Sequence, residues 1–378
     1  MKLFSKKIEK SIAEFKKSST FASLFTKQSA GVVVQLVRIP ACHAGGRGFE
    51  SLPHRREDRL TVCLFCFYTG SFTKILLPMK KLFALLIVIV SISAQIQAQP
   101  LAKHVILIGL DGWAAHDFDN VRNNIPNIRS LIKNGSCNMH KRSVLPSDSG
   151  VNWASMFMGV GPEMHGYTTW DSKKHDLPSS TTNKNGIFPT IFSIIREQYP
   201  EAETGCTFEW DGIKYVIDTL AISHVHFFSE GWEPVEKNCD HIVKYITESK
   251  PMFYAACFDG PDGPGHKYGW YSDGYYEYLA RVDKCVGRII QALKDAGIYD
   301  DTIIVVTGDH GGHDHGHGSL AMEDMESPLV FFGRNVRSGY TYTDPIAQYD
   351  VAASIAYILD LKMPEAWRGK PVKQVFIR

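Results

Sequence analysis

The chain lacks a net excess of charge of either sign, since 41 Lys and Arg residues stand against 40 Asp and Glu residues over 378 positions. The balance is uneven, because residues 1–78 hold 13 basic and 5 acidic residues, which leaves 28 basic and 35 acidic residues on the rest of the chain. This excludes a uniformly basic nucleic-acid-binding protein, and we expect no nucleic-acid-binding surface. The hydrophobic content of 44% also excludes intrinsic disorder for most of the chain.

The sequence also lacks an apolar run long enough to span a bilayer comfortably, which takes about 20 residues. The apolar run from Leu82 to Ile92 lies within residues 79–98, where two lysines follow a Met and small and polar residues end at Ala98. This order is typical of a secretory signal peptide, cleaved after Ala98. A buried core helix would show an amphipathic period, which is absent, and a signal anchor is the other alternative. We therefore expect an exported protein, periplasmic or secreted, with no stable membrane span.

Residues 1–78, upstream of this segment, do not read as part of a fold. Residues 31–55 resemble a translated transfer-RNA gene, because Gly48–Ser51 can be encoded by the T-arm sequence of such genes. We interpret residues 1–78 as a doubtful upstream extension and expect the native protein to begin at Met79. The alternative is a basic, flexible extension, and neither interpretation gives it a function.

Cysteine is sparse in the remaining part of the chain. Five cysteines lie there, at positions Cys137, Cys206, Cys239, Cys257 and Cys285. An exported protein could pair some of them, and the odd number leaves at least one free. The pattern leaves the connectivity open.

Continuous apolar runs alternate with helical patterns between residues 99 and 378. Runs at 104–110, 252–258, 302–306 and 329–333 are typical of buried strands, whereas apolar residues at three- and four-residue spacing predict a helix over 272–296. Strands alternating with helices indicate an α/β domain with a mostly parallel sheet covered on both faces. Residues 170–250 are less regular, and we expect them to form a cap-like region facing the substrate.

Three loops that follow apolar runs carry carboxylates and imidazoles, which are the ligands that zinc and related divalent ions prefer. They hold Asp111; Asp262 and His266; and Asp309, His310, His313, His315 and His317. In α/β sheets, loops at the carboxyl ends of strands converge on one site. Because Gly263, Pro264 and Gly265 separate Asp262 from His266, we expect these two residues to meet through a loop rather than through a helical turn.

A fourth segment, residues 145–157, supplies a candidate nucleophile. Its later part is typical of a helix, which places Ser149 at a helix N-terminus, where backbone N–H groups favour an anion. The alternative is that Ser149 only caps this helix.

The four segments, in this order, resemble the type I phosphodiesterase/nucleotide pyrophosphatase family of the alkaline phosphatase superfamily. The resemblance rests on an LDG strand end, a P-[ST]-x-[ST]-x-x-N segment, a GPExHG turn at 161–166, a D-x-x-x-H pair, and a DHG motif with a later HG. It covers nearly the whole chain after residue 98. It implies an alkaline phosphatase-like, three-layer α/β/α sandwich with a mostly parallel sheet, and two divalent metal ions, which we take to be Zn²⁺.

The resemblance also implies which residues hold the ions. The first ion would have the ligands Asp111, Ser149, Asp309 and His310. The second would have Asp262, His266 and a third histidine, for which we choose His317 because its HG context fits the related pattern best. His313 and His315 are then expected to be supporting or loop residues.

A mechanism follows from the resemblance. Ser149 would attack phosphorus and form a covalent intermediate, which water then hydrolyses, and the Asn152 amide would contact a phosphoryl oxygen. The sequence is thus interpreted as an exported two-metal phosphoric ester hydrolase acting on a small phosphoester, with the oligomeric state left open.

Departures from the family pattern leave the substrate open. Gly150 and Cys257 occupy places where nucleotide-cleaving relatives carry aromatic residues, so Trp113 and Trp170 are proposed as substrate-binding alternatives. A phosphate monoesterase, for which Arg142 would be the candidate phosphate ligand, and a phosphonate hydrolase are alternatives in the same superfamily. A non-catalytic exported metal-binding protein is the alternative from another class.

Overall fold

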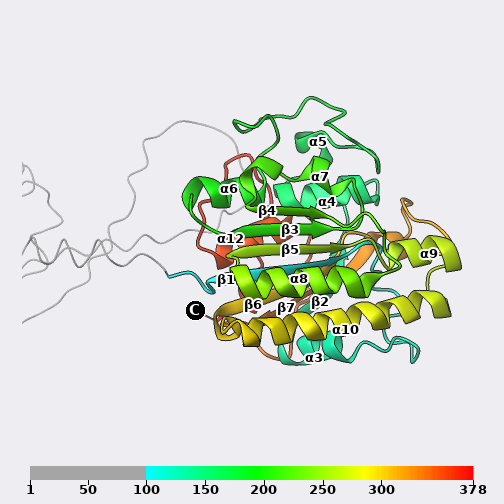
Figure 1. The fold of residues 1–378 in the computed structure, drawn as a ribbon. Coiled ribbons are helices and arrows are strands. Elements are labelled where there is room, and N and C mark those ends of the chain that lie inside the picture. Colours follow the sequence, from blue (N-terminus) through cyan, green and yellow to red (C-terminus); the bar gives the residue numbers. More distant parts are fainter. Residues whose placement is uncertain (1–98, 378) are drawn as a thin grey trace, which may run out of the picture. The chain divides into compact units, whose positions relative to one another are not determined.

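The computed structural model describes residues 99–377, which form one mixed eight-stranded sheet with helices on both faces (Figure 1). The predicted signal peptide and the upstream extension lie outside the described residues. The strand order is β4–β3–β5–β1–β6–β7–β2–β8. The strands are β1 (His104–Leu110), β2 (Ser136–Arg142), β3 (Thr204–Phe208), β4 (His224–Phe227), β5 (Phe253–Phe258), β6 (Thr302–Gly308), β7 (Glu326–Gly333) and β8 (Tyr340–Thr341).

The sheet is mostly parallel, as predicted. β4, β3, β5, β1 and β6 pair in parallel, and β7 runs antiparallel to both β6 and β2. The central register places Leu110 opposite both Phe258 and Gly308. The carboxyl ends of β5, β1 and β6 therefore meet at one edge of the sheet.

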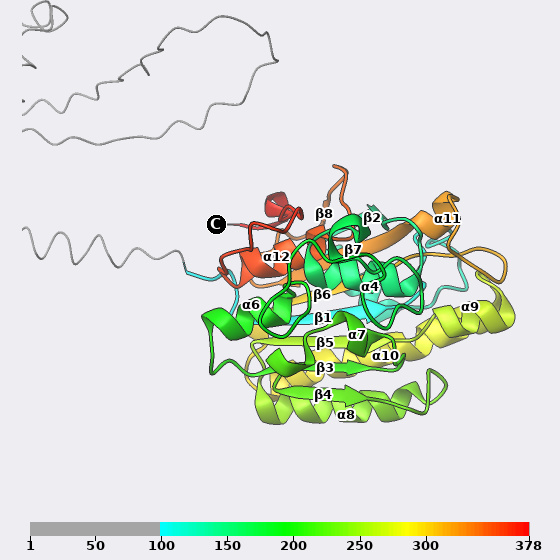
Figure 2. The same cartoon turned by 90° about the horizontal axis from the view of Figure 1, so that it is seen from above.

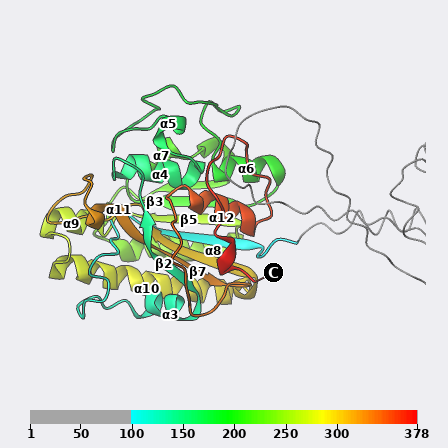
Figure 3. The ribbon, with the colours of Figure 1, turned by 180° about the vertical axis from the view of Figure 1, so that it is seen from behind.

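The helices form two layers, which confirms the predicted three-layer sandwich (Figures 1 and 3). One face carries α3 (Pro126–Asn134), α8 (Val235–Ser249) and α10 (Asp273–Asp295), and the other carries α4 (Ser149–Met158), α6 (Ile191–Gln198), α7 (Ile213–Val216) and α12 (Asp350–Ile358). Shorter helices are α5 (Pro162–His165), α9 (Asp262–Tyr268) and α11 (Met322–Met325), with 3-10 turns at Thr219–Ala221, Tyr299–Asp301 and Lys373–Val375.

Strand β1 shows why the sequence folds into layers. Its side chains alternate between the two faces, so that Val105 and Leu107 enter one buried core and Ile106 and Ile108 enter the other. Both faces are apolar, and the strand therefore reads as one continuous hydrophobic run. Each fully buried aliphatic side chain contributes about 1.5–3 kcal/mol.

The predicted helix over 272–296 is confirmed in α10, which spans Asp273–Asp295. Ser272 is its N-cap, and the Ser272 hydroxyl accepts a hydrogen bond from the Tyr275 backbone N–H at 3.3 Å. The cap satisfies one of the free N–H groups that every helix start presents.

The region 170–250 differs from the expected cap. Residues 170–190 are irregular, but residues 191–249 contain α6, β3, β4 and α8 and extend the main sheet to its edge. The sequence does not indicate these two strands, because the region begins with polar residues, β3 and β4 are short, and only β3 is fully buried.

A disulfide bond joins α8 to α10 within one helical layer. It links Cys239 to Cys285, with 5.7 Å between their Cα atoms. Cys137, Cys206 and Cys257 are free and buried. Between residues 99 and 377, no helix has both the length and the apolar character needed to cross a membrane.

Candidate active site

Strands β1, β5 and β6 lie side by side in the sheet (Figure 2), and the candidate ligands follow their carboxyl ends. Asp111 follows β1, Asp309 follows β6, and Asp262 begins α9 just beyond β5. The Asp262 N–H donates to the Asp111 carbonyl at 2.9 Å, which ties the β1 and β5 loops together. Gly112 makes this contact possible, because its φ is +67° and an added Cβ would lie 2.9 Å from Asp262 Cα.

A first ligand group consists of Asp111, Asp309 and His310, all buried. His310 Nε2 lies 3.3 Å from Asp111 Oδ1 and 3.4 Å from Asp309 Oδ2. His310 Nδ1 lies 2.7 Å from the Gly311 carbonyl, which can only accept, so Nδ1 carries the proton. The lone pair of Nε2 therefore faces the two carboxylates, in the tautomer that suits a metal ligand.

The charges of this first group are not balanced by the protein. Burial, followed by the charge of Asp111, raises the pKa of Asp309 well above its usual value. Burial also opposes ionisation of Asp111, but the hydrogen bond and the charge that His310 supplies when it is protonated, followed by the Trp153 hydrogen bond, lower the pKa of Asp111 overall. Asp309 Oδ2 is buried without a hydrogen-bond partner. A buried carboxylate oxygen in this state is expected to bind a cation.

A second ligand group consists of Asp262, His266 and His317. His266 Nε2 lies 3.4 Å from Asp262 Oδ2, and His317 Nε2 lies 3.6 Å from Asp262 Oδ1. His266 Nδ1 is held by the His315 carbonyl at 2.9 Å and His317 Nδ1 by the Ser147 carbonyl at 3.1 Å, so both Nε2 atoms are free to bind an ion. Asp262 Oδ1 is buried and has no hydrogen-bond partner.

The predicted loop between Asp262 and His266 is wrong. Both residues lie on α9, one helical turn apart. The helix accommodates Pro264 because this residue is in its first turn, where a backbone N–H has no partner inside the helix. Positions four residues apart share one helix face, so the turn itself brings the two side chains together.

Ser149 lies beside the first group. Its Oγ is 3.3 Å from Asp111 Oδ1 and 3.1 Å from His310 Nε2. It is the first residue of α4, and the residue at the N-cap position is Asp148. The alternative that Ser149 only caps this helix is therefore not what the structure shows. The rings of His310 and His317 stack with centroids 4.0 Å apart, so the two ligand groups adjoin.

Asn152 does not face the site as expected. Its amide nitrogen donates to the carbonyls of Val144, Pro146 and Asp148 at 3.0–3.2 Å, and its Oδ1 accepts from the Val144 N–H at 2.7 Å. The side chain is fully buried. It holds the loop before α4 in place, and its amide hydrogens are already used. These hydrogen bonds do not favour the predicted contact with a phosphoryl oxygen, which stays a prediction.

A cavity of about 440 Å³ opens over the second group and over Ser149, which adjoins the first group. It is lined by Asp148, Ser149, Trp170, Trp210, Asp259, Asp262, His266 and His317. The predicted Trp170 is among them and is 57% exposed. Trp113 is not: it is 1% exposed and packs in the core, so its proposed substrate contact is wrong. The side chain of a residue three positions after a strand can point into the core as readily as into the site.

Three lining residues were missed from the sequence. Asp259 follows β5 directly, and Trp210 follows β3 after one intervening residue. Asp148 precedes Ser149. The rule that selects polar residues at strand ends would have found Asp259. Burial, followed by the charge of Asp111, raises the pKa of Asp259 well above its usual value.

The other two histidines of the third loop are engaged elsewhere. His313 Nδ1 lies 2.7 Å from Asp324 Oδ1, and this hydrogen bond raises the pKa of His313. His315 Nδ1 lies 3.1 Å from the His266 carbonyl. Both positions agree with the expected supporting or loop roles.

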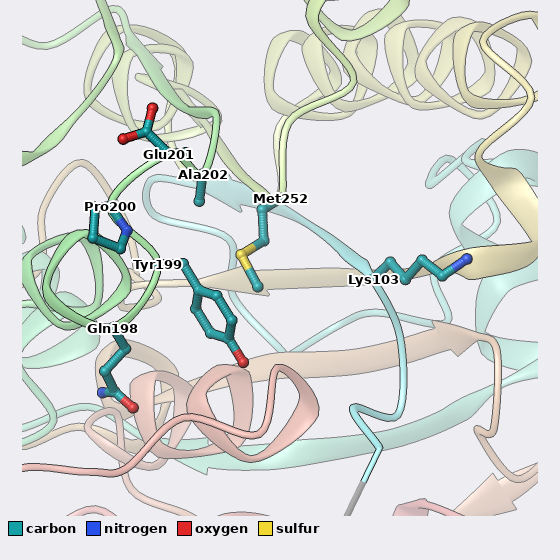
Figure 4. A pocket seen from close by; sticks show the side chains of 7 residues that line it. All are labelled: Lys103, Gln198, Tyr199, Pro200, Glu201, Ala202 and Met252. Carbon is teal, nitrogen blue, oxygen red and sulfur yellow. The ribbon is translucent and has the colours of Figure 1, made fainter. Parts of the chain in front are cut away.

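A second pocket, of about 460 Å³, is open and mainly apolar and lies next to the amino ends of β1 and β5 (Figure 4). It is lined by Lys103, Gln198, Tyr199, Pro200, Glu201, Ala202 and Met252. None of the predicted ligands or nucleophiles lies in it, and we assign the site to the carboxyl end of the sheet.

Comparison with known proteins supports this assignment. Residues 105–329 match the family model of the type I phosphodiesterase / nucleotide pyrophosphatase family. Over 217 residues the chain is 26% identical to human ectonucleotide pyrophosphatase/phosphodiesterase family member 1, and over 220 residues it is 24% identical to human bis(5'-adenosyl)-triphosphatase ENPP4. These matches cover 54% and 56% of this chain but only 23% and 48% of the relatives.

Solved structures share the fold. Murine ectonucleotide pyrophosphatase / phosphodiesterase 5, in complex with AMP, superimposes with a TM-score of 0.60 at 16% identity and covers 73% of this chain and 100% of its own. The phosphonate monoester hydrolase SpPMH from Silicibacter pomeroyi gives a TM-score of 0.55 at 15% identity, covering 72% and 76%. Fold and family model agree, and the chain belongs to the type I phosphodiesterase / nucleotide pyrophosphatase family.

Proposed function

We propose that this protein is an exported phosphodiesterase that binds two divalent ions and works through a covalent intermediate on Ser149. The observation that carries the proposal is the position of Ser149 Oγ, 3.1 Å from His310 Nε2 in the first ligand group and in the same cavity as the second. A non-catalytic metal-binding protein would have no need of a hydroxyl at this point.

The donor set fits two divalent ions. Asp111, Asp309, His310 and the Ser149 oxygen would hold the first, and Asp262, His266 and His317 the second. Each group contains one buried carboxylate oxygen without a partner, Asp309 Oδ2 and Asp262 Oδ1. Mixed carboxylate and imidazole ligands suit zinc. Bound divalent ions supply charge that lowers the pKa of a hydroxyl or a water and stabilises the oxygens around phosphorus.

The side chains of the first group prepare the nucleophile. Asp111 Oδ1 accepts the hydrogen bond of the Ser149 hydroxyl at 3.3 Å, and Trp153 Nε1 fixes Asp111 Oδ2 at 2.8 Å. Ser149 Oγ gives its proton to solvent and forms a bond to phosphorus while the bond from phosphorus to the leaving ester oxygen breaks; the electron pair departs with that oxygen, which takes up a proton from solvent. A water oxygen then bonds to phosphorus and releases one proton, the bond from phosphorus to Ser149 Oγ breaks, and Ser149 Oγ takes up a proton, which restores the hydroxyl.

The charge of the cavity favours a diester over a monoester. Its lining contains three Asp residues, and neither Lys nor Arg is among the residues that form it. Arg142, the candidate phosphate ligand of a monoesterase, is instead paired with Glu326 at 2.9 Å and is about half exposed. A phosphomonoester carries about two negative charges at neutral pH and a diester one, so the diester needs less countercharge.

The aromatic residues of the cavity suit a substrate with a flat or apolar group. Trp170 and Trp210 belong to the lining, and the curated relatives are named for nucleotide pyrophosphatase/phosphodiesterase and bis(5'-adenosyl)-triphosphatase activities. Indole rings stack on aromatic groups and contribute about 0.5–1.5 kcal/mol beyond the area they bury. We therefore include nucleotide diesters among the substrates of the proposed enzyme.

Export is supported by the disulfide bond. Disulfides persist in oxidising compartments, and Cys239 and Cys285 lie within bonding geometry. This agrees with the signal peptide predicted at residues 79–98.

The decisive experiment compares hydrolysis of bis-p-nitrophenyl phosphate and p-nitrophenyl phosphate, with and without added zinc, in the wild type and in Ser149→Ala. We expect zinc-dependent turnover of the diester that falls by at least about a thousandfold in Ser149→Ala. Ser155→Ala is the matched control, because Ser155 is a buried serine of the same helix α4 and should retain turnover. Faster turnover of the monoester would indicate a phosphatase, and metal uptake without turnover of either ester would overturn the proposal.

A further inference from the structure

Three histidines gather at the edge of the sheet, apart from the candidate active site. His224 and His226 lie on the edge strand β4, and His241 lies on α8, which packs beside it (Figure 2). Residues i and i+2 of a strand point to the same face, so both histidines of β4 can face the helix. None of the three lines the catalytic cavity.

The distances within this cluster are those of a metal-binding pair. His224 Nε2 lies 2.9 Å from His241 Nε2. Two imidazole nitrogens bound to one ion at 2.0–2.1 Å are about 2.9 Å apart at a right angle and about 3.3 Å apart in tetrahedral geometry. The ring of His226 stacks on that of His241 with 3.8 Å between centroids, so a third imidazole adjoins the pair.

We propose that His224 and His241, with His226 beside them, form a metal site separate from the candidate active site, which binds a divalent transition-metal ion such as Ni²⁺, Cu²⁺ or Zn²⁺. Two imidazole ligands without a carboxylate favour ions that prefer nitrogen ligands over Mg²⁺ or Ca²⁺. The bound ion would join the edge strand to α8, the helix that Cys239 and Cys285 already join to α10.

The surroundings hold the pair in place and keep it neutral. The ring of Tyr245 stacks on His224 with centroids 4.4 Å apart, and the Tyr245 hydroxyl donates to Glu203 at 2.5 Å. Burial, followed by the neighbouring charges of His226 and His224, lowers the pKa of His241 to about 4.

A hydrogen bond between two neutral imidazoles is the alternative account of the short distance, and it requires no ion. The two accounts differ in what the addition of metal does. A pair that is only hydrogen-bonded gains no stability from added metal, whereas an ion that binds only the folded state raises the melting temperature with the logarithm of its concentration above Kd.

The test uses the untagged full chain loaded with two equivalents of zinc, the number that the catalytic ligands hold, so that the histidine pair is left open to Ni²⁺. NiCl₂ is added in a thermal-melting series, and retention on immobilised Ni²⁺ is measured as the imidazole concentration at elution. The variants are the double substitution His224→Gln with His241→Gln, the single substitution His226→Gln, and His140→Gln. The last is the matched control, because His140 is an exposed histidine on β2, near the other edge of the sheet.

We expect the wild type and His140→Gln to be retained and to melt at higher temperature with Ni²⁺. The double variant should lose both effects, and His226→Gln should lose part of them. Circular dichroism of each variant without added Ni²⁺ establishes that the fold is kept. Equal retention of the double variant and the wild type, or the absence of a Ni²⁺-dependent melting shift in the wild type, would overturn the proposal.

Discussion

The two ligand groups of the candidate active site differ in how far they are removed from water. In the first group, the side chains of Asp111, Asp309 and His310 are at most 3% exposed. In the second, His266 is 47% exposed, and Asp262 and His317 are 13% and 11% exposed. The nucleophile candidate Ser149 contacts the buried group.

This difference indicates that the two ligand groups have different roles in the reaction. A buried group has a lower effective dielectric constant, so its charges act more strongly on the Ser149 hydroxyl. The exposed group can exchange water and product more easily, which suits the release of the leaving group and the entry of water. Substitutions in the first group should therefore lower kcat/KM more than substitutions in the second group. Excess zinc should also restore less of the lost activity in the first group.

The largest effect is expected from Asp309→Asn. The asparagine retains an oxygen to accept from the Gly112 and His310 N–H groups, which lie 3.0 and 2.8 Å from Asp309 Oδ1, but it removes the charge. We expect kcat/KM for the diester to fall by at least about a thousandfold, and excess zinc should not restore it. Because burial raises the pKa of Asp309, the metal-free variant should also be at least as stable as the wild type.

Asp283→Asn is the matched control for that result. Asp283 is equally buried, but its oxygens accept from the N–H groups of Asn127 and Ile128 at 3.1 and 2.7 Å and hold α3 against α10. Its substitution should lower the melting temperature and leave kcat/KM unchanged. The comparison fails if Asp309→Asn loses stability while Asp283→Asn loses activity.

The strand ends that form these groups could be predicted from the sequence, and the reason is physical. Strands buried on both faces appear as continuous apolar runs, and the polar residue after such a run must lie where the strand leaves the core. This rule placed Asp111 and Asp309 at one edge of the sheet. It did not extend to β4, which lies at the edge and alternates between half-buried and exposed residues.

The orientation of single side chains could not be predicted in this way. Asn152 and Trp113 stand at positions that suit a site residue, yet one turns into the loop before α4 and the other into the core. A one-bond rotation decides such cases, and no spacing in the sequence records it. The α9 turn was missed for another reason, because two glycines and a proline normally oppose a helix, and here the proline stands in the first turn.

His266→Asn, in the second group, should lower kcat/KM less than Asp309→Asn does, and excess zinc should reverse the loss. Water can replace a lost ligand at a half-exposed position, so we expect kcat/KM to fall by about tenfold to a hundredfold at limiting zinc. Excess zinc should recover most of the loss, in contrast to Asp309→Asn. Zinc titrations of the two variants, followed by diester turnover, measure this difference. Equal recovery in both would show that burial does not separate the two groups.

Trp153→Phe should have a weaker effect on the first group, because Trp153 acts through Asp111. Its Nε1 donates to Asp111 Oδ2 at 2.8 Å, and the phenyl ring lacks this donor. We expect about a tenfold loss in zinc affinity or kcat/KM and a loss of about 1–3 kcal/mol in stability, since the oxygen stays buried. Trp113→Phe, at an equally buried tryptophan outside the cavity lining, should affect only stability. Unchanged zinc affinity in Trp153→Phe would remove this residue from the mechanism.

The smallest effect concerns Glu209, a buried carboxyl beneath the cavity. Burial raises its pKa to about 7, although the Asp259 N–H and the Asn238 amide donate to it at 2.8 Å. In the unfolded chain Glu209 loses this proton near its usual pKa of 4.5, whereas the folded chain keeps it to about pH 7. Between these values the unfolded state binds fewer protons, so the free energy of unfolding falls as pH rises.

Glu209→Gln should remove this pH dependence. Asn238 Oδ1 is buried without a partner, and rotation of the Asn238 amide would let it accept from the new glutamine. We therefore expect the variant to gain stability over the wild type by up to about 3 kcal/mol on going from pH 5 to pH 8. Urea unfolding at both pH values measures the change. A constant difference between variant and wild type would show that Glu209 is ionised throughout.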